Sequence, residues 1–174
     1  MPISNEGRRP ATEAEARALA SALRLRILRM CLDRALTNKE IAGRLGMHPA
    51  TTLHHVRTLV ATGFLAAQEE RRGARGAREV PYLATRKSWR MDVEDSGVAG
   101  GGTAMLEAFL QEVRLVDQDS AAFARLGLRL DEKELDEFRT RLGELLNDFE
   151  AREPTADGKP YSVFIALHPD VTRD

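Results

Sequence analysis

The sequence contains no run of about 18 consecutive apolar residues, so it predicts no membrane-spanning helix. Its first ten residues, MPISNEGRRP, have neither an apolar core nor a small-residue cleavage site, and we therefore expect no signal peptide. The chain has a single cysteine, Cys31, which cannot form an internal disulfide. These absences favour a soluble protein of the reducing cytoplasm that has no membrane partner.

The sequence motifs of common enzyme classes are also missing. There is no nucleophile elbow, no phosphate-binding loop and no set of residues at metal-ligand spacing. We therefore expect no enzymatic activity, no metal and no cofactor, and the sequence identifies no cofactor-binding residue. With 174 residues of ordinary soluble composition, the chain can form one domain or two small ones.

Charge is distributed unevenly along the chain. Residues 1–90 hold 17 Lys and Arg against 8 Asp and Glu, a balance of +9, whereas residues 91–174 hold 9 against 19, a balance of −10. Together they give the overall net charge of −1. A basic half joined to an acidic half suggests that the first half binds a polyanion, although two solvated surfaces of opposite sign would give the same totals.

The first helix is expected to begin after Thr12, because Thr12 and Glu15 have the spacing of a capping box. Its apolar residues form two adjoining stripes, one of Leu19, Leu23, Ile27 and Met30 and one of Leu25, Leu28 and Leu32. We expect a helix with so wide an apolar surface to be buried on two sides, one against its own domain and the other against a partner chain.

Two further helices follow in the order of a helix-turn-helix unit. Thr37 and Glu40 have the spacing of a second capping box, and Gly46 stands where a left-handed residue ends a helix. Pro49 is suited to the first turn of the next helix, which is predicted over residues 49–63. Two short helices joined by a tight turn that contains glycine form a helix-turn-helix.

A β-hairpin is predicted over residues 65–85, directly after the second of these helices. Two strand-like segments, 65–72 and 78–85, flank the glycine-rich sequence GARGA. Its arginines are suited to contact phosphates or a narrow minor groove, and they are Arg71, Arg72, Arg75 and Arg78. Lys39, near the start of the preceding helix-turn-helix, is also placed to contact a phosphate.

A helix over residues 49–63 has two distinct faces. The face expected to be buried contains Thr52, Val56, Leu59 and Gly63. The opposite face is small, polar and basic, as is needed to approach base edges in the major groove, and it contains Ala50, Thr51, His54, Arg57, Thr58 and Ala61. His54 and His55 point about 100° apart, which disfavours a shared metal ion. We expect His55 to be half-buried and His48 to cap the helix.

The stretch IAGRLGMHPATTLHHVRTLVATGFL and the hairpin after it resemble the winged helix-turn-helix of ArsR-like transcription regulators, and ALASALRLRILRM resembles the opening helix of that family. The resemblance covers residues 14–90 and implies a homodimeric DNA-binding repressor or activator. Carried over by position, it assigns the base-reading face to Ala50, Thr51, His54, Arg57 and Thr58, and the wing to Arg71–Arg78. The chain departs from metal-sensing members because it has no paired cysteines, and Cys31 lies in an apolar stretch where a buried thiol is expected.

The acidic half is expected to form a separate domain. Residues 91–102 include three consecutive glycines and are predicted to be a linker. Apolar residues at helical spacing predict helices over residues 103–117 and around the Leu135–Phe149 stripe, and PYSVFIALHP predicts a buried strand over Tyr161–Leu167. We expect residues 103–174 to serve dimerisation and to hold the site of a candidate small-molecule effector.

The sequence thus predicts a mainly α fold with a small β wing, in which a winged helix-turn-helix over residues 12–90 precedes a helical segment with one strand. The expected function is transcription regulation by a homodimer on a palindromic site in double-stranded DNA. Two alternatives stay open: a metal- or redox-responsive sensor of the same fold, and a winged-helix module that binds proteins.

Overall fold

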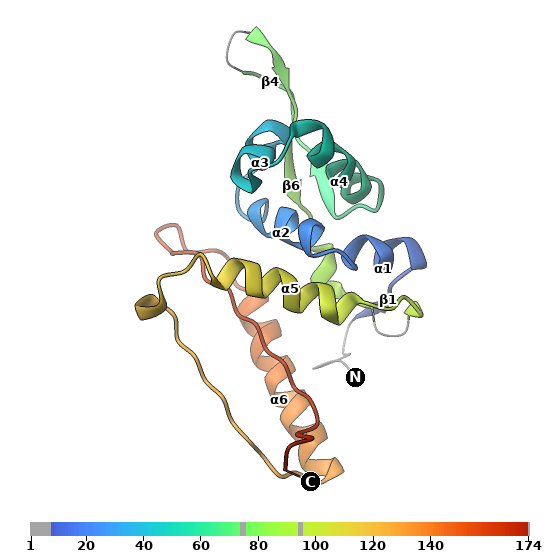
Figure 1. Ribbon diagram of the computed structural model, residues 1–174, viewed down its shortest axis with the longest axis vertical. Coiled ribbons are helices and arrows are strands. Elements are labelled where there is room, and N and C mark those ends of the chain that lie inside the picture. The colour runs from blue at the N-terminus through green and yellow to red at the C-terminus, as the bar shows by residue number, and fades with distance from the viewer. Residues whose placement is uncertain (1–7, 74–75, 94–95, 174) are drawn as a thin grey trace. The chain divides into compact units, whose positions relative to one another are not determined.

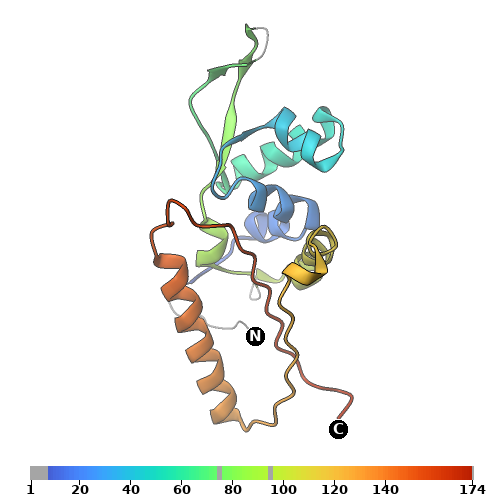
Figure 2. The ribbon, with the colours of Figure 1, turned by 90° about the vertical axis from the view of Figure 1, so that its left-hand side faces the viewer.

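A computed structural model describes residues 8–73, 76–93 and 96–173 (Figure 1; Figure 2). The chain is mainly helical with a few short strands, as the sequence predicts. It forms two compact units, of which one covers Gly7–Val116 and the other includes Asp117–Asp174. Among the described residues, no helix is long and apolar enough to cross a membrane.

The first helical region consists of two helices. Helix α1 spans Glu13–Leu19 and helix α2 spans Ala22–Met30. Ser21 separates them because it acts as a second N-cap, and its side chain accepts a hydrogen bond from the backbone N–H of Arg24. The single helix predicted from the continuous apolar pattern is therefore wrong.

The next two helices form the predicted helix-turn-helix. Helix α3 spans Asn38–Leu45 and begins with the expected capping box, in which Thr37 and Glu40 each bond the other's backbone N–H. Gly46 ends α3 with a φ of 63°, a conformation that glycine adopts without steric cost. Helix α4 then spans Pro49–Ala61.

The predicted hairpin over residues 65–85 is confirmed, but each of its strands is split in two. Near the helices, β3 (Leu65–Ala67) and β6 (Pro81–Ala84) join β2 (Leu36–Thr37) in an antiparallel sheet of order β2-β6-β3. Further out, β4 (Arg71–Arg72) pairs with β5 (Arg78–Glu79). The β3–β6 pairing ends next to Pro81, which accepts a hydrogen bond from the Gln68 N–H at 2.8 Å but has no backbone N–H to donate in return. Both views show the β4 end projecting away from the helices of this unit (Figure 1; Figure 2).

The core of the Gly7–Val116 unit joins the helices to the sheet. Its fully buried side chains come from α2, α3, α4, the strands and the turn before β3, and they include Ile27, Leu36, Ile41, Leu59 and Phe64. Close packing of this kind holds α4 at a fixed place in its unit.

Two elements follow the wing within the same unit. After the short 3-10 helix η2 (Lys87–Arg90), strand β7 (Met91–Asp92) pairs in parallel with β1 (Arg9–Pro10). Residues 91–92, the start of the segment expected to be a linker, are therefore buried in this pairing.

Helix α5 spans Gly101–Val113 and lies alongside α2 (Figure 1). Small side chains at Ala104 and Ala108 are buried there, and Arg29 of α2 forms a 2.7 Å ion pair with Glu112. The helix predicted over residues 103–117 thus exists, but it begins two residues earlier and ends four residues earlier than predicted. It belongs to the Gly7–Val116 unit, where it packs on α2.

The other unit contains a short 3-10 helix, η4 (Gln118–Ser120), and one long helix, α6 (Glu132–Ala151). The buried strand predicted over Tyr161–Leu167 is wrong for the single chain, because these residues have no strand assignment and Tyr161 and Val163 are 87% and 69% exposed. A β-strand needs a second strand to hydrogen-bond with, and the described part of this unit contains no strand that could pair with these residues.

Candidate nucleic-acid interface

Helix α4 has the two faces that the sequence predicts. Thr52, Val56 and Leu59 are buried. Of the expected base-reading residues, four are exposed, and they are Ala50, Thr51, His54 and Arg57. Thr58 is partly buried, and its hydroxyl donates to the carbonyl of His54 at 3.1 Å, so that proton is used within the helix. The face open to a ligand therefore consists of short side chains, one imidazole and one guanidinium.

The three histidines of this region have different surroundings. His48 caps α4 as expected, because its Nδ1 accepts a hydrogen bond from the N–H of Ala50 at 3.2 Å. His55 is half-buried; burial lowers its pKa, and the charges of Arg24 and His54 lower it further. His54 is exposed and contacts His55 only ring edge to ring, with centroids 5.6 Å apart.

The wing arginines differ in what they contact. Arg71 is held against the helix-turn-helix, because it donates to both carboxylate oxygens of Glu40 on α3, at 2.9 and 3.0 Å. Arg78 is 3.6 Å from Glu70, and both side chains are largely exposed. Arg72 is exposed, and no partner is assigned to it among the described residues. Arg75 lies outside the described residues.

Lys39 is exposed on the first turn of α3, where the sequence placed it. The residue before it, Asn38, donates from its side-chain amide to the carbonyl of Pro49 at 2.8 Å. This bond joins the start of α3 to the start of α4. It therefore fixes the position of Lys39 relative to the exposed face of α4.

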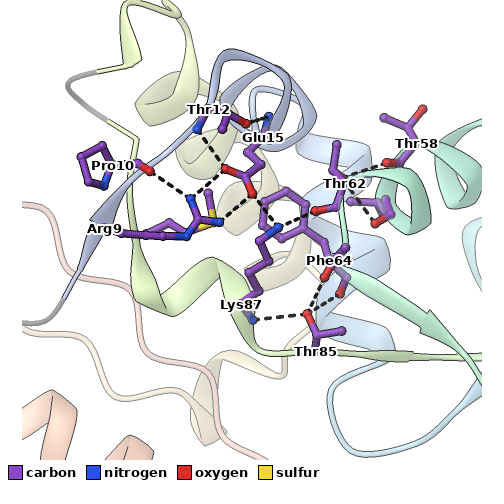
Figure 3. Close-up of polar contacts among 12 residues, drawn as sticks. Arg9, Pro10, Thr12, Glu15, Thr58, Thr62, Phe64, Thr85 and Lys87 are labelled. Atoms are coloured by element: carbon purple, nitrogen blue, oxygen red, sulfur yellow. Dashed lines mark hydrogen bonds and ion pairs between the residues drawn. The ribbon is translucent and has the colours of Figure 1, made fainter.

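A buried carboxylate organises the opposite end of α4 (Figure 3). Glu15 on α1 accepts hydrogen bonds from Arg9 at 2.7 and 3.0 Å and from the Thr12 backbone N–H at 2.9 Å, and Lys87 lies 2.5 Å away. The hydrogen bonds from Arg9 hold the pKa of this carboxyl well below its usual value, and Lys87 and Thr12 act in the same direction against the cost of burial.

Lys87 connects this network to α4. Its ammonium group donates to the carbonyl of Thr62, the C-cap residue of α4, at 2.7 Å and lies 5.3 Å from the ring centroid of Phe64. A cation at a helix C-terminus is favourable because the last carbonyls carry partial negative charge. Sequence reasoning identified Glu15 only as a capping residue, because no spacing along the chain links positions 9, 15 and 87.

The single cysteine lies in the core. Cys31 is fully buried, and burial raises the pKa of its thiol to about 11. Such a thiol stays protonated near neutral pH. The described residues contain no group of three or more His, Cys, Asp or Glu side chains that could hold a metal ion.

Residues 25–69 match the family model of the IclR helix-turn-helix domain. The chain carries a helix-turn-helix DNA-binding domain. The match spans most of α2 and all of α3, α4 and β3. A solved structure, reduced HlyU from Vibrio cholerae, is similar at 24% identity over 54% of this chain and 81% of that chain, with a TM-score of 0.35. No curated protein sequence matches the chain significantly.

The helix-turn-helix domain contains the residues expected to read bases. Lys39 and the exposed face of α4 fall inside the matched range, whereas the wing arginines follow its end at residue 69. Helices α3 and α4 therefore lie within the matched domain, and most of the wing lies outside it.

Proposed function

We propose that this protein is a transcription regulator that binds double-stranded DNA as a homodimer on a palindromic operator. Its recognition helix is α4, within residues 49–63, and its wing is the hairpin of residues 65–85. The observation that carries the proposal is the exposed face of α4, which is small, polar and basic beside a buried apolar face. A helix with short side chains can approach base edges closely in the major groove.

Within this interface the side chains have separate roles. Arg57 and His54 donate hydrogen bonds to base edges, and the small residues Ala50 and Thr51 allow close approach. Thr58 lies at the border of the face, where its methyl group and hydroxyl oxygen meet the groove. Phosphates are contacted by Lys39 and by the wing, with Arg71, Arg72, Arg75 and Arg78 as the contributing arginines.

The proposed dimer uses helix α5. Its side opposite α2 carries a row of apolar residues, and Met105, Leu106 and Leu110 are 49%, 45% and 40% exposed. No element among the described residues of the Gly7–Val116 unit covers this row. Contiguous apolar surface of this kind marks an association site, and a second copy would cover it while placing two recognition helices about a two-fold axis.

We also propose that the helix-turn-helix is of the ArsR-like kind, which the order of capped helix, glycine turn, polar helix and basic hairpin supports. Residues 103–174 then contribute to dimerisation, through α5, and to effector response. Cys31 is unsuited to redox sensing, because its thiol is buried and burial raises its pKa.

The test is selection of DNA from a random duplex pool by the full-length chain, followed by affinity measurements at increasing salt. We expect an enriched two-fold motif with half-sites about one helical turn apart, or a multiple. Affinity should fall steeply as salt rises, because arginine and lysine contacts to phosphate release counterions. A pool without an enriched motif, or an affinity independent of salt, would contradict the proposal and favour a protein-interaction module.

A further inference from the structure

A surface pocket of about 400 Å³, partly open to solvent and called the cavity below, lies where the chain leaves β6 of the wing. It is lined by Arg9, Thr85, Lys87, Arg90 and Met91, which come from β1, the end of β6, η2 and β7. Its size is within the range of about 300–1,000 Å³ that small-molecule sites occupy. Three of its lining side chains are cationic and none is anionic.

Two of the three cations, Arg9 and Lys87, are held in place by a carboxylate that does not line the cavity. Arg9 and Lys87 both bond the buried carboxylate of Glu15, which does not line the cavity (Figure 3). Lys87 is fixed further by the Thr62 carbonyl. A binding site gains affinity when its charged groups are already ordered, because little side-chain freedom is then lost on binding.

The third cation of the cavity is Arg90, whose side chain is exposed. No ion pair or hydrogen bond of the Arg90 side chain is assigned within the described parts of the chain. Glu15 pairs with Arg9 and Lys87, and no anionic side chain lines the cavity itself. Met91 adds an apolar contact to the same cavity.

We propose that this cavity binds a small organic anion, a carboxylate or phosphate ester with an apolar body, whose oxyanion is held by Arg90 together with Arg9 and Lys87. Guanidinium groups suit this role because they donate paired hydrogen bonds to carboxylate and phosphate oxygens. The volume of the cavity is large enough for an organic body beside the anionic group. Because Lys87 also bonds the C-cap of α4, a bound ligand acts on a residue that holds the recognition helix.

The experiment measures binding by the full-length chain in the absence of DNA, so its result is independent of the proposed function. The only tryptophan, Trp89, lies within η2 between two lining residues and is therefore a fluorescence reporter of the site. The probes are benzoate, phenyl phosphate, inorganic phosphate and the neutral benzamide. We expect saturable fluorescence changes with benzoate or phenyl phosphate, and none with benzamide.

The variant Arg90→Gln should weaken binding of the organic anion about tenfold or more, as expected for the loss of a charge-assisted hydrogen bond. Arg90→Lys should recover part of the affinity. Arg34→Gln, which removes an equal charge from an exposed residue outside the cavity, should change affinity less than about twofold. Circular dichroism confirms that each variant is folded.

The inference is overturned if neither organic anion binds, if inorganic phosphate alone binds, or if the two arginine-to-glutamine variants lose affinity equally. A loss of DNA affinity in Arg90→Gln without any anion binding would also overturn it, because the cavity cations would then serve the DNA backbone.

Discussion

Arg57 is the only positively charged side chain on the exposed face of α4, and it contacts no described side chain that would neutralise it. Replacing it tests whether this face reads bases. We expect Arg57→Ala to cost about 1–3 kcal/mol of DNA binding and to relax the base preference at one position of each half-site. Selection from a random pool, repeated with the variant, measures both effects.

The matched control for Arg57→Ala is Arg17→Ala, which removes an exposed arginine on α1 that pairs with Glu13. This control should keep the base preference. If Arg57→Ala binds the same sequences with the same affinity as the unaltered chain, α4 does not read bases through this residue.

Glu15 should give the protein a specific dependence on acid. Its folded-state pKa is lowered by Arg9 and Lys87, so its contribution to stability is fully present above the unfolded-state pKa of about 4.3 and is lost as pH falls below that value. Glu15→Gln should therefore reduce the free energy of unfolding by about 1–3 kcal/mol at pH 7. The difference in free energy of unfolding between the unaltered chain and Glu15→Gln should become smaller at acid pH.

Urea unfolding followed by circular dichroism at pH 7 and at acid pH measures this difference. Glu13→Gln is the control, because Glu13 is two residues away and its assigned partner among the described residues, Arg17, is exposed as Glu13 is. A Glu15→Gln protein as stable as the unaltered chain at pH 7 would show that the network in Figure 3 contributes nothing to folding.

Among the elements, the wing combines an anchoring arginine with an exposed one. Arg71 binds Glu40 on α3, whereas Arg72 next to it has no assigned partner in the described residues. We expect Arg71→Ala to speed amide hydrogen exchange in β4, because the wing loses its attachment to α3. Arg72→Ala should leave that exchange unchanged and reduce the salt slope of DNA binding by about one.

Hydrogen exchange by mass spectrometry and binding isotherms at several salt concentrations separate the two roles. Equal exchange rates in both variants would contradict an anchoring role for Arg71.

The helix-turn-helix and its wing could be predicted from sequence because their signals are local. Thr37 with Glu40 and Gly46 determine where α3 begins and ends, and both are readable from spacing alone. The break at Ser21 was missed because apolar periodicity continues through it, although a serine N-cap competes with helix continuation. The predicted Tyr161–Leu167 strand failed for the opposite reason, since strand formation depends on a partner that local sequence does not contain.

The site was predictable only in part for the same reason. The exposed face of α4 follows from helical geometry, whereas two of the ion pairs depend on tertiary contacts. Arg71 and Glu40 are 31 residues apart, and Lys87 and Glu15 are 72 residues apart. Charge totals could not distinguish an arginine available to DNA from one already paired.

For the whole molecule, the apolar side of α5 should decide the oligomeric state. Leu106→Glu combined with Leu110→Glu introduces charge into this surface and should give a folded monomer in sedimentation experiments. Affinity for a two-fold DNA site should fall, because the second half-site is no longer bound by a linked subunit. Glu107→Gln, an exposed change between them on the same helix, should leave the dimer intact. A double variant that remains dimeric would place the interface elsewhere.

The two compact units carry opposite charge, and this should be visible in DNA binding. The Gly7–Val116 unit holds 18 Lys and Arg against 12 Asp and Glu, a balance of +6, whereas Met1–Glu6 and Asp117–Asp174 together hold 8 against 15, a balance of −7. The Gly7–Val116 unit has its own buried core, so we expect a chain of residues 1–116 to fold alone.

At low salt this shortened chain should bind non-specific duplex DNA more tightly than the full-length chain, because the acidic residues that repel phosphate are gone. The difference should narrow at high salt, where exposed charges are screened. Fluorescence anisotropy at several salt concentrations measures it, and a shortened chain that folds but binds non-specific DNA no more tightly would mean that the acidic unit exerts no electrostatic effect on the DNA-binding surface.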